Sequence, residues 1–382
     1  MATALFVFDH IFPVDSAGNC YYSSGFDEDF FKRYYSIFDR VDIFGRKRVK
    51  DALDAKNIVA FPSKFYLFNS NKIIAKAYKR IDEAILNNSC VIIRMPSIFG
   101  SLAIKRARKL GKPYIIEIVS CEYDALSTSK SYLRRMLARP AELFYRLILK
   151  NNPYSIYVTK TFLQSKYPSK GEQIAISNVT LPIVDESLLK KREKHYCSFN
   201  PQERLLLGTC STLDVDFKGQ EYVIRAIPDL VCAGLNVEYQ LVGDGNGKWL
   251  TDIAKEIGVQ KRVKLIGHLD HNQVFEWLDS IDIYVHPSCQ EGLSRAIIEA
   301  MSRACPVVAA DAGGVFELID KDFVFPKRDS SAIVFCIKRI LKNGLLDQAT
   351  ANITKSKEYR MDHLYKKRED FFHHFLKEND IQ

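Results

Sequence analysis

Glu291 and Glu299 lie eight residues apart in the stretch EGLSRAIIEAM. The strand-like run IDIYVHPS precedes them, and a helical pattern begins at about Leu293. A helix N-terminus offers free N–H groups and a partial positive charge, which suit a phosphate, and Gly292 allows its close approach. We expect Glu291 at the mouth of this site, accepting hydrogen bonds from hydroxyl groups. Glu299, about two turns on, suits a vicinal diol such as that of a ribose.

A simpler alternative for both carboxylates stays open. Glu291 can favour the helix N-terminus by electrostatics alone. Glu299 can form an ordinary surface pair with Arg295, four residues earlier on the helix.

The glycine-rich stretch VGDGNG, residues 243–247 with the preceding valine, resembles a fragment of the dinucleotide-binding fingerprint. Its third glycine is not at the position that this fingerprint requires, and the acidic residue about 20 positions further on is absent. We interpret it as a turn between a strand and a helix, with Gly245 near a phosphate or sugar of the ligand.

The stretch HPSCQEGLSRAIIEAMSRACPVVAADAGGVFELI resembles the signature of the retaining glycosyltransferases of family 4, which have the GT-B architecture. The segments LVGDGNGKWLTDIAKEIGVQKRVKLIGHL and FKGQEYVIRA resemble the same family in order and spacing. The resemblance is dense over residues 203–330. The first half is similar only in outline, through VIIRMPSIFG, RKLGKPYIIEIVSCEYDA and ISNVTL, to members that build bacterial surface polysaccharides.

The resemblance implies catalytic roles for Glu291 and Lys218. Glu291 would contact hydroxyl groups of the donor sugar near the reacting carbon, and Lys218 would neutralise the diphosphate as a point charge. Glu299 would hold the ribose diol. The other expected donor-binding residues are Gly292, Leu293 and Ser294 at the diphosphate, Gly245 nearby, and His268 and Leu269 at the nucleobase.

The sequence departs from the family in the stretch GTCSTLDVDFKG, which has no arginine before Lys218. Family members usually carry one there as a second cation for the diphosphate. Arg94 and Arg295 are the candidates to replace it. The segment LIDKDFVFP also lacks the glycine that the family usually has before its last strand.

The expected chemistry is the transfer of a sugar with expulsion of a nucleoside diphosphate. Fixed N–H dipoles and a lysine stabilise the negative charge that builds on the leaving oxygen. In the retaining family, the leaving phosphate itself helps to deprotonate the acceptor, so no separate base is required. The resemblance also implies that no bound metal is needed, and we expect no cofactor and no metal.

The first half of the chain contains the candidates for the acceptor or phosphate side. Gly18 follows the first predicted strand, in the loop that borders the phosphate in this architecture, although a plain turn explains it equally well. Glu122 and Asp124 follow a middle strand in EIVSCEYDA, where a solvated loop is the alternative.

Residues 130–150, KSYLRRMLARPAELFYRLILK, combine basic and apolar residues at helical spacing, with Pro140 dividing the run. Such a helix can lie on an anionic membrane surface. The alternative is a surface helix whose apolar side faces the sheet.

Short apolar runs alternate with helical patterns along the chain, which predicts parallel sheets covered on both faces. The pattern breaks at about residues 185–203 and then restarts. The predicted fold class is α/β, GT-B, with two Rossmann-like doubly wound domains facing across a cleft. Residues 1–190 form the acceptor-side domain, residues 203–358 the donor domain, and residues 359–382 a C-terminal helix that can cross back to the first domain.

The composition fits a globular protein of 382 residues with 47% hydrophobic residues and a net charge of +9, which favours an anionic partner. Nine cysteines show no CxxC or metal spacing and indicate reduced thiols in a cytosol. We find no signal peptide, no transmembrane run and no nucleic-acid-binding module. We expect a cytoplasmic location. Peripheral attachment to the inner face of the cell membrane is the alternative.

We predict a retaining hexosyltransferase that moves a sugar from a nucleotide sugar, UDP-linked by preference, to a glycan or lipid-linked glycan in cell-surface polysaccharide synthesis. Two alternatives remain. A nucleotide-sugar epimerase would release an altered sugar without an acceptor. An inactive nucleotide-sugar-binding subunit would dock partners at the membrane, and the missing arginine keeps that alternative open.

Overall fold

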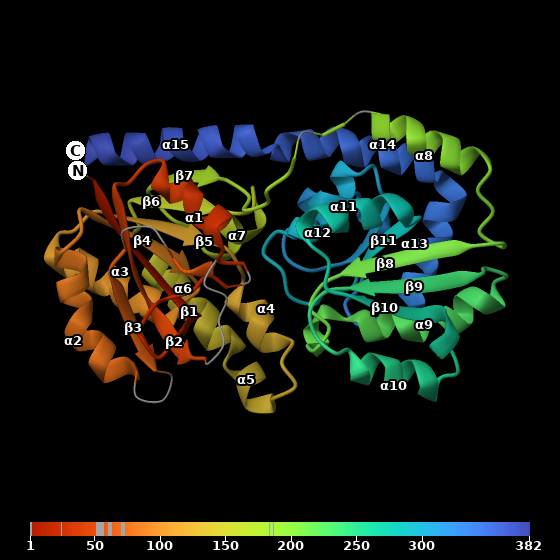
Figure 1. Ribbon diagram of the computed structural model, residues 1–382, viewed down its shortest axis with the longest axis horizontal. Helices are drawn as coiled ribbons and strands as arrows, with labels where there is room; N and C mark the ends of the chain where they lie inside the picture. The colour runs from red at the N-terminus through yellow and green to blue at the C-terminus, as the bar shows by residue number, and fades with distance from the viewer. Residues whose placement is uncertain are drawn as a thin grey trace. The chain divides into compact units, whose positions relative to one another are not determined.

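The computed structural model describes the chain except for residues 1, 24, 51–56, 60–62, 70–72, 183 and 186, and except for the side chains of residues 73–76 and 343. Contacts divide the chain into two compact units (Figure 1). The first unit contains residues 1–120, 141–176 and 364–382. The second contains residues 121–140 and 177–363.

The first unit is built on a seven-stranded parallel sheet in the order β3-β2-β1-β4-β5-β6-β7. Its strands are β1 (Thr3–Val14), β2 (Arg40–Val49), β3 (Phe65–Asn69), β4 (Cys90–Met95), β5 (Tyr114–Ile118), β6 (Tyr154–Tyr157) and β7 (Glu172–Ala175). Its helices are α1 (Glu28–Tyr35), α2 (Ile73–Leu86), α3 (Ile98–Leu110), most of α6 (Ala138–Leu149), α7 (Phe162–Lys166) and the greater part of α15 (Met361–Glu378).

Aromatic side chains join the helices of the first unit to its sheet. Phe6 of β1 meets Phe30 and Phe31 of α1, with ring centroids 5.8 and 5.6 Å apart. Phe372 of α15 packs on Tyr34 at the end of α1 at 6.1 Å. Because strand order reverses direction at β1, right-handed crossovers place the connecting helices on both faces of the sheet.

The second unit is built on a six-stranded parallel sheet in the order β10-β9-β8-β11-β12-β13. Its strands are β8 (Leu205–Cys210), β9 (Val237–Val242), β10 (Val263–Gly267), β11 (Ile283–His286), β12 (Val307–Ala310) and β13 (Val324–Phe325). Its helices are α4 (Glu122–Ser127), α5 (Tyr132–Met136), α8 (Ser187–Cys197), α9 (Gln220–Cys232), α10 (Lys248–Glu256), α11 (His271–Ser280), α12 (Arg295–Ser302), α13 (Ser330–Asn343) and α14 (Leu345–Ser356).

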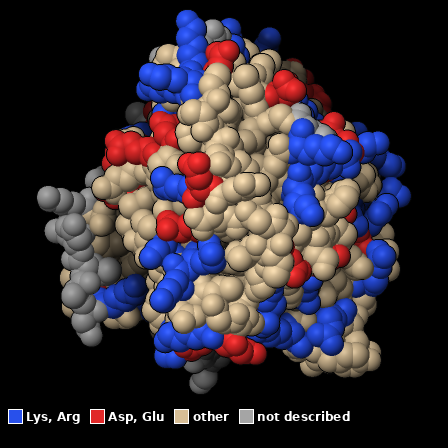
Figure 2. All heavy atoms as spheres, turned by 90° about the vertical axis from the view of Figure 1, so that its right-hand side faces the viewer, with Lys and Arg blue, Asp and Glu red and all other residues tan. Residues whose placement is uncertain are grey.

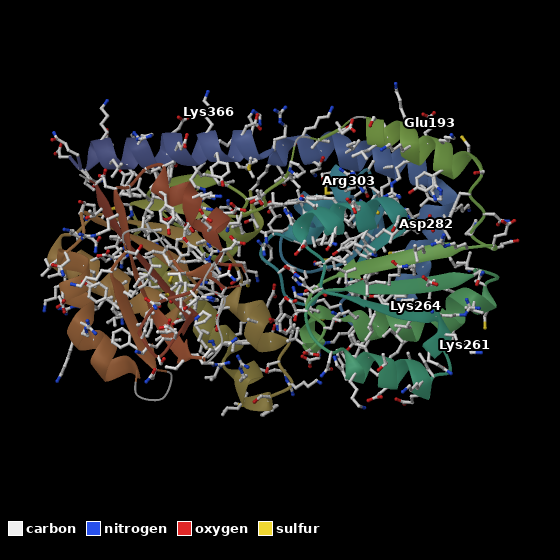
Figure 3. The ribbon with its side chains drawn as sticks, viewed as in Figure 1. Glu193, Lys261, Lys264, Asp282, Arg303 and Lys366 are labelled. Atoms are coloured by element: carbon white, nitrogen blue, oxygen red, sulfur yellow. The ribbon has the colours of Figure 1, made fainter. Side chains whose placement is uncertain are left out.

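Helix α8 lies inside the stretch where the sequence predicts a break between domains. The contacts instead break between residues 176 and 177, so α8 belongs to the second unit. Its buried Arg192 donates to the carbonyl oxygens of Leu278 (2.6 Å) and Ile281 (2.5 Å) at the end of α11. His195 binds Asp282 at 2.7 Å, at the amino end of β11 (Figure 3). These polar contacts act together with Leu188, the one buried apolar side chain of this helix, which packs against α14.

Residues 121–140 also cluster with the second unit, whereas the sequence assigns residues 1–190 to one domain. Lys130 pairs with Asp216 at 3.0 Å, and Lys327 lies 3.6 Å from Asp124. Arg328 donates to the carbonyl oxygen of Thr128. These contacts join residues that are distant in sequence, which explains why the strand and helix pattern does not predict them.

Within the part of the chain that the structure describes, no helix is both long enough and apolar enough to cross a membrane.

Candidate functional site

Lys218 and Glu291 meet at the carboxyl ends of two neighbouring strands in the second unit. Lys218 lies in the loop between β8 and α9, and Glu291 lies in the loop between β11 and α12. Because β8 and β11 are adjacent and parallel, their following loops lie at the same edge of the sheet. Lys218 Nζ donates to Glu291 Oε1 at 2.7 Å, with side chains 20% and 15% exposed.

The backbone fixes these two loops against each other. The N–H of Cys289 donates to the carbonyl oxygen of Phe217 at 2.7 Å. Gly219 has a φ of +72°, and a Cβ at this position would collide with the carbonyl oxygen of Pro287. Lys218 therefore lies between two points of close backbone contact with the loop that carries Glu291.

A buried histidine orients the Glu291 carboxylate. His286 Nε2 lies 3.1 Å from Glu291 Oε1, and His286 Nδ1 lies 3.4 Å from the hydroxyl of Tyr284. That hydroxyl donates to the carbonyl oxygen of Cys210 at 3.3 Å. Since an ionised carboxylate only accepts hydrogen bonds, Nε2 carries the proton in this arrangement.

The charge of Glu291 follows from these contacts. Burial acts to raise the pKa of Glu291, but the Lys218 ammonium and the hydrogen bond from His286 outweigh it and hold the pKa well below its usual value. Glu291 is therefore ionised at neutral pH and has no proton to donate. It can accept hydrogen bonds and balance positive charge.

The N-terminus of α12 presents backbone donors beside Glu291. The Ser294 hydroxyl caps the helix by accepting from the N–H of Ile297 at 3.3 Å. Among the described residues, the N–H groups of Gly292, Leu293 and Ser294 donate to no protein acceptor. These groups could bind an anion.

Gly313 and Gly314, after β12, support the loop before α12. The N–H of Gly314 donates to the carbonyl oxygen of Gly292 at 2.7 Å. Gly313 has a φ of +61°, and a Cβ there would collide with the carbonyl oxygens of Glu291 and Gly292. Only glycine allows this close approach without a backbone shift.

Glu299 lies on α12 with its side chain 16% exposed. Its Oε1 is 3.7 Å from His271 Nε2, at the start of α11, and no ion pair joins it to Arg295 among the residues described. Burial and then the Glu299 charge raise the pKa of the Cys210 thiol to about 12, so Cys210 is a neutral side chain at this edge. Glu299 has no strong protein partner and can accept ligand hydroxyl groups.

The glycine-rich turn is anchored by an acidic side chain of its own unit. Asp214 Oδ1 accepts from the N–H groups of Asn246 and Gly247, both at 3.1 Å. Gly245 has a φ of +117°, and a Cβ there would lie 2.7 Å from the Asp214 carboxylate. The Asn246 and Gly247 donors are therefore already used within the protein.

His268 and Leu269 follow β10 at the same carboxyl edge of the sheet. His268 is exposed, and its Nδ1 lies 2.7 Å from Asp244 Oδ1 in the glycine-rich turn. Leu269 is half-buried. The two residues lie on the loop that leads into α11.

Glu122 and Asp124 begin α4, in the segment that clusters with the second unit. The Asp124 side chain is almost fully buried and lies 3.6 Å from Lys327 Nζ. Close by, the amide of Gln290, the residue before Glu291, donates to the hydroxyl of Thr128 at 2.5 Å. The end of α4, at Thr128, is thus attached to the loop that carries Glu291.

Arg94 and Gly18 lie in the first unit. Arg94 Nη1 donates to the buried Glu117 at 3.2 Å, and its guanidinium lies over the ring of Phe30 at 5.1 Å. Gly18 has a φ of +92° in a surface turn, where its N–H donates to the carbonyl oxygen of Asp15. Structural contacts account for both positions.

The supporting residues His286, Tyr284 and Asp214 are not among the site residues predicted from the sequence. The residue type and its place at a strand end are the only local signals for His286. The Asp214 contact spans more than thirty residues of sequence, so no short motif contains it. The glycine pair at Gly313 and Gly314 is visible in the sequence, and its role becomes evident from the close backbone approach.

Comparisons with known proteins show which proteins this chain resembles. Residues 204–343 match the family described as Glycosyl transferases group 1. The chain is 29% identical to Protein CapJ of Staphylococcus aureus, over 98% of this chain and 93% of that protein.

Solved structures share the fold. Anabaena HepE in complex with UDP and glucose has a TM-score of 0.66 at 16% identity, covering 97% of this chain and 99% of that one. WaaG, a glycosyltransferase involved in lipopolysaccharide biosynthesis, has a TM-score of 0.63 at 15% identity, covering 96% and 98%. At these identities the likeness shows the fold alone. The predicted GT-B fold and the resemblance to group 1 glycosyltransferases are confirmed.

Proposed function

We propose that this group 1 glycosyltransferase transfers a hexose from a UDP-linked donor, with retention, to a glycan or lipid-linked glycan in cell-surface polysaccharide synthesis. The structural likeness to HepE, which binds UDP and glucose, supports the donor class. The likeness to WaaG, which acts in lipopolysaccharide biosynthesis, supports the acceptor class. With a lipid-linked acceptor, the sugar transfer would take place at the inner face of the cell membrane.

The observation that carries the proposal is the contact between Lys218 and Glu291 beside the N-terminus of α12. A diphosphate at that helix would accept hydrogen bonds from the N–H groups of Leu293 and Ser294. It would also lie beside the positive charge of Lys218. A donor sugar attached to it would then lie against Glu291, the neighbour of Lys218. The negative diphosphate would thus lie at the positive charge of Lys218, and the donor sugar would lie at the negative charge of Glu291 beside it.

The reaction would proceed by charge stabilisation rather than by a protein base. The bond between the anomeric carbon and the diphosphate oxygen breaks, and its electron pair goes to the diphosphate. The acceptor oxygen bonds to the same carbon on the same face, and its proton passes to the leaving diphosphate. Lys218 and the N–H groups stabilise the leaving group, while ionised Glu291 stabilises the positive sugar ring.

Arg295 is the better candidate for the missing second cation. It is exposed at the first turn of α12, beside the proposed diphosphate, and among the described residues it has no ion pair or hydrogen-bond partner. Arg94 is held by Glu117. With cations and N–H groups supplying the positive charge, we propose that turnover requires no metal or cofactor and persists in a chelator.

Two substitutions test the catalytic pair. Lys218→Met and Glu291→Gln should each lower sugar transfer by about 100-fold or more, because each removes charge stabilisation at the reacting centre. Lys264→Met and Glu193→Gln are matched controls on exposed side chains (Figure 3) and should leave activity unchanged.

The products distinguish the proposal from its alternatives. NMR of the product should show the anomeric configuration of the donor, and product should form only with acceptor present. An inverted linkage would contradict retention, and release of an altered sugar without acceptor would indicate an epimerase. Donor binding without turnover would favour an inactive subunit.

A further inference from the structure

A cavity of about 260 Å³ lies in the second unit, between α8 and the ends of α11 and α12. Its polar lining residues are Lys191, Arg192 and His195 of α8, Asp279 and Ser280 of α11, and Arg303 after α12. Helices α11 and α12 begin at the proposed donor site, near Glu299 and Glu291, and they end at this cavity. Sites for drug-sized ligands have volumes of roughly 300–1,000 Å³. The cavity is therefore separate from the donor site and suits a small metabolite.

Positive charge exceeds negative charge among the side chains that line the cavity. Lys191, Arg192 and Arg303 are cations, and Asp279 is the one carboxylate among the described lining residues. Arg303 donates through Nε to Asp279 Oδ1 at 2.7 Å and through Nη2 to the other oxygen, so these two charges balance (Figure 3). Lys191 is exposed and has no ion pair or hydrogen bond to a side chain that the structure describes. Lys191 and Arg192 therefore leave an excess of positive charge.

Carboxylates close to the cavity do not remove this excess. Asp282 pairs with His195 at 2.7 Å, and the exposed Asp185, just before α8, accepts from the Ser187 hydroxyl at 2.6 Å. Neither aspartate lines the cavity. On the face of the second unit seen in Figure 2, by contrast, basic and acidic side chains are interspersed. The excess of positive charge is thus a property of the cavity.

Arg192 supplies hydrogen-bond donors for an anion. It is 5% exposed, and its guanidinium caps the end of α11 through the carbonyl oxygens of Leu278 and Ile281. A third and longer hydrogen bond, of 3.4 Å, joins Nε to the carbonyl oxygen of Arg303. Because a guanidinium has five N–H groups, two of them have no acceptor within the described part of the chain. Arg192 also forms no ion pair there, although buried charges are usually paired.

We propose that this cavity binds a small phosphate monoester. A phosphate group carries a charge of about −1.5 to −2 at neutral pH, which balances Lys191 and Arg192 better than a carboxylate does. Its oxygens would accept hydrogen bonds from the remaining N–H groups of Arg192 and from the Lys191 ammonium. The carbon part of the ester would contact the buried Leu188. The Ser280 hydroxyl, which donates to the carbonyl oxygen of Trp277 at 2.7 Å, could accept from a ligand hydroxyl.

A bound ester would join α8 to the ends of α11 and α12. Because a ligand that binds only the folded chain stabilises it, the melting temperature should rise with the concentration of the ester. This site does not rest on the proposed sugar transfer, so the two proposals can fail independently.

Calorimetric titration of the full chain tests the site, with glycerol phosphate as the probe. We expect glycerol phosphate to bind, inorganic phosphate to bind more weakly, and glycerol not to bind. Glycerate, which has a carboxylate in place of the phosphate, should bind more weakly by about tenfold or more, because it has less charge and fewer acceptor oxygens.

Three variants locate the site. Lys191→Glu should weaken the binding of glycerol phosphate by about tenfold or more, because a repelling carboxylate replaces a charged donor. Lys194→Glu makes the same change of charge on α8 outside the lining, and it should bind as the wild type does. Both lysines are exposed, so folding should be unaffected, whereas a variant of the buried Arg192 could unfold. Lys218→Met, in the donor site, should also bind as the wild type does.

No binding of glycerol phosphate, or equally tight binding of glycerate, would overturn the proposal. Equal weakening in Lys191→Glu and Lys194→Glu would also overturn it, because general charge attraction would then explain the binding. Binding that Lys218→Met abolishes and Lys191→Glu leaves unchanged would place the anion at the N-terminus of α12 instead.

Discussion

Glu291 shows how single residues prepare this site before any ligand binds. One of its oxygen atoms accepts hydrogen bonds from both the Lys218 ammonium and the His286 imidazole. Its other oxygen has no such partner among the hydrogen bonds of the described residues and remains open to a sugar hydroxyl. These neighbours thus keep the carboxylate ionised and oriented. A ligand can bind its open oxygen without displacing both of them.

His286 should act by positioning Glu291. His286→Ala should lower kcat by about tenfold, as is typical for loss of a supporting hydrogen bond, while the Kd for UDP stays close to the wild-type value. His286→Gln should recover part of kcat, because its amide can still donate. If the glutamine variant is as slow as the alanine variant, and both melt earlier, His286 contributes packing rather than orientation.

His10, in the first unit, should make stability depend on pH. Burial, and then Arg94, lower the pKa of His10 from 6.5 to about 4. As pH falls below about 6.5 the unfolded chain binds a proton that the folded chain does not, so stability decreases down to about pH 4. His10→Gln should show a smaller decrease in melting temperature over this window. An equal decrease in both proteins would contradict the assignment.

Residue types at the site could be predicted because the requirements are local. A glycine and a helix start lie beside Glu291 in one short stretch, and the physics of a helix N-terminus does not depend on the rest of the fold. His286 could not be predicted, because its partner is defined by the geometry of a turn. For Arg94, the buried partner Glu117 is visible only in three dimensions.

Among the structural elements, the loops after β8 and β11 matter most, because they hold Lys218 beside Glu291. Gly219→Ala should lower both activity and stability, because a Cβ would meet the Pro287 carbonyl oxygen in a conformation with positive φ. Gly234→Ala is a matched control with a φ of +86° and no atom within 4 Å of the added Cβ. We expect the control to lose about 1 kcal/mol and the Gly219 variant to lose about 2 kcal/mol more.

Urea unfolding and a transfer assay on both variants check this. Similar losses of stability in the two proteins, with activity retained in the Gly219 variant, would show that the loop contact is dispensable.

The alternation of strands and helices could be predicted, because buried parallel strands are short apolar runs. The division into units could not. Helix α8 is held by the guanidinium of Arg192 and by the pair of His195 with Asp282, together with Leu188 as its one buried apolar side chain. Residues 121–140 are held by contacts such as Lys130 with Asp216, which no periodic pattern reveals.

For the molecule as a whole, the end of the chain is part of the first unit. Arg368 of α15 donates to Glu117 at 2.9 Å, and both side chains are buried. Arg368→Ala should destabilise the protein by about 3 kcal/mol, because it leaves a buried carboxylate with one cation fewer. Lys366→Ala, on the same helix and directed outward (Figure 3), should change stability by less than about 0.5 kcal/mol.

Chemical denaturation of the two variants measures the difference. Equal free energies of unfolding would mean that the aromatic contacts of α15 suffice without the ion pair.

The proposed function requires that the carboxyl edge of β8 and β11 binds a nucleoside diphosphate, with Glu299 on its ribose. The most direct measurement is calorimetric titration of the metal-free protein with UDP, comparing wild type with Glu299→Ala and with the exposed control Glu256→Ala. We predict micromolar binding to wild type and control, and a Kd raised by about tenfold or more in Glu299→Ala, because a ribose hydroxyl loses its charged acceptor. No binding of UDP, or an unchanged Kd in Glu299→Ala, would contradict the account.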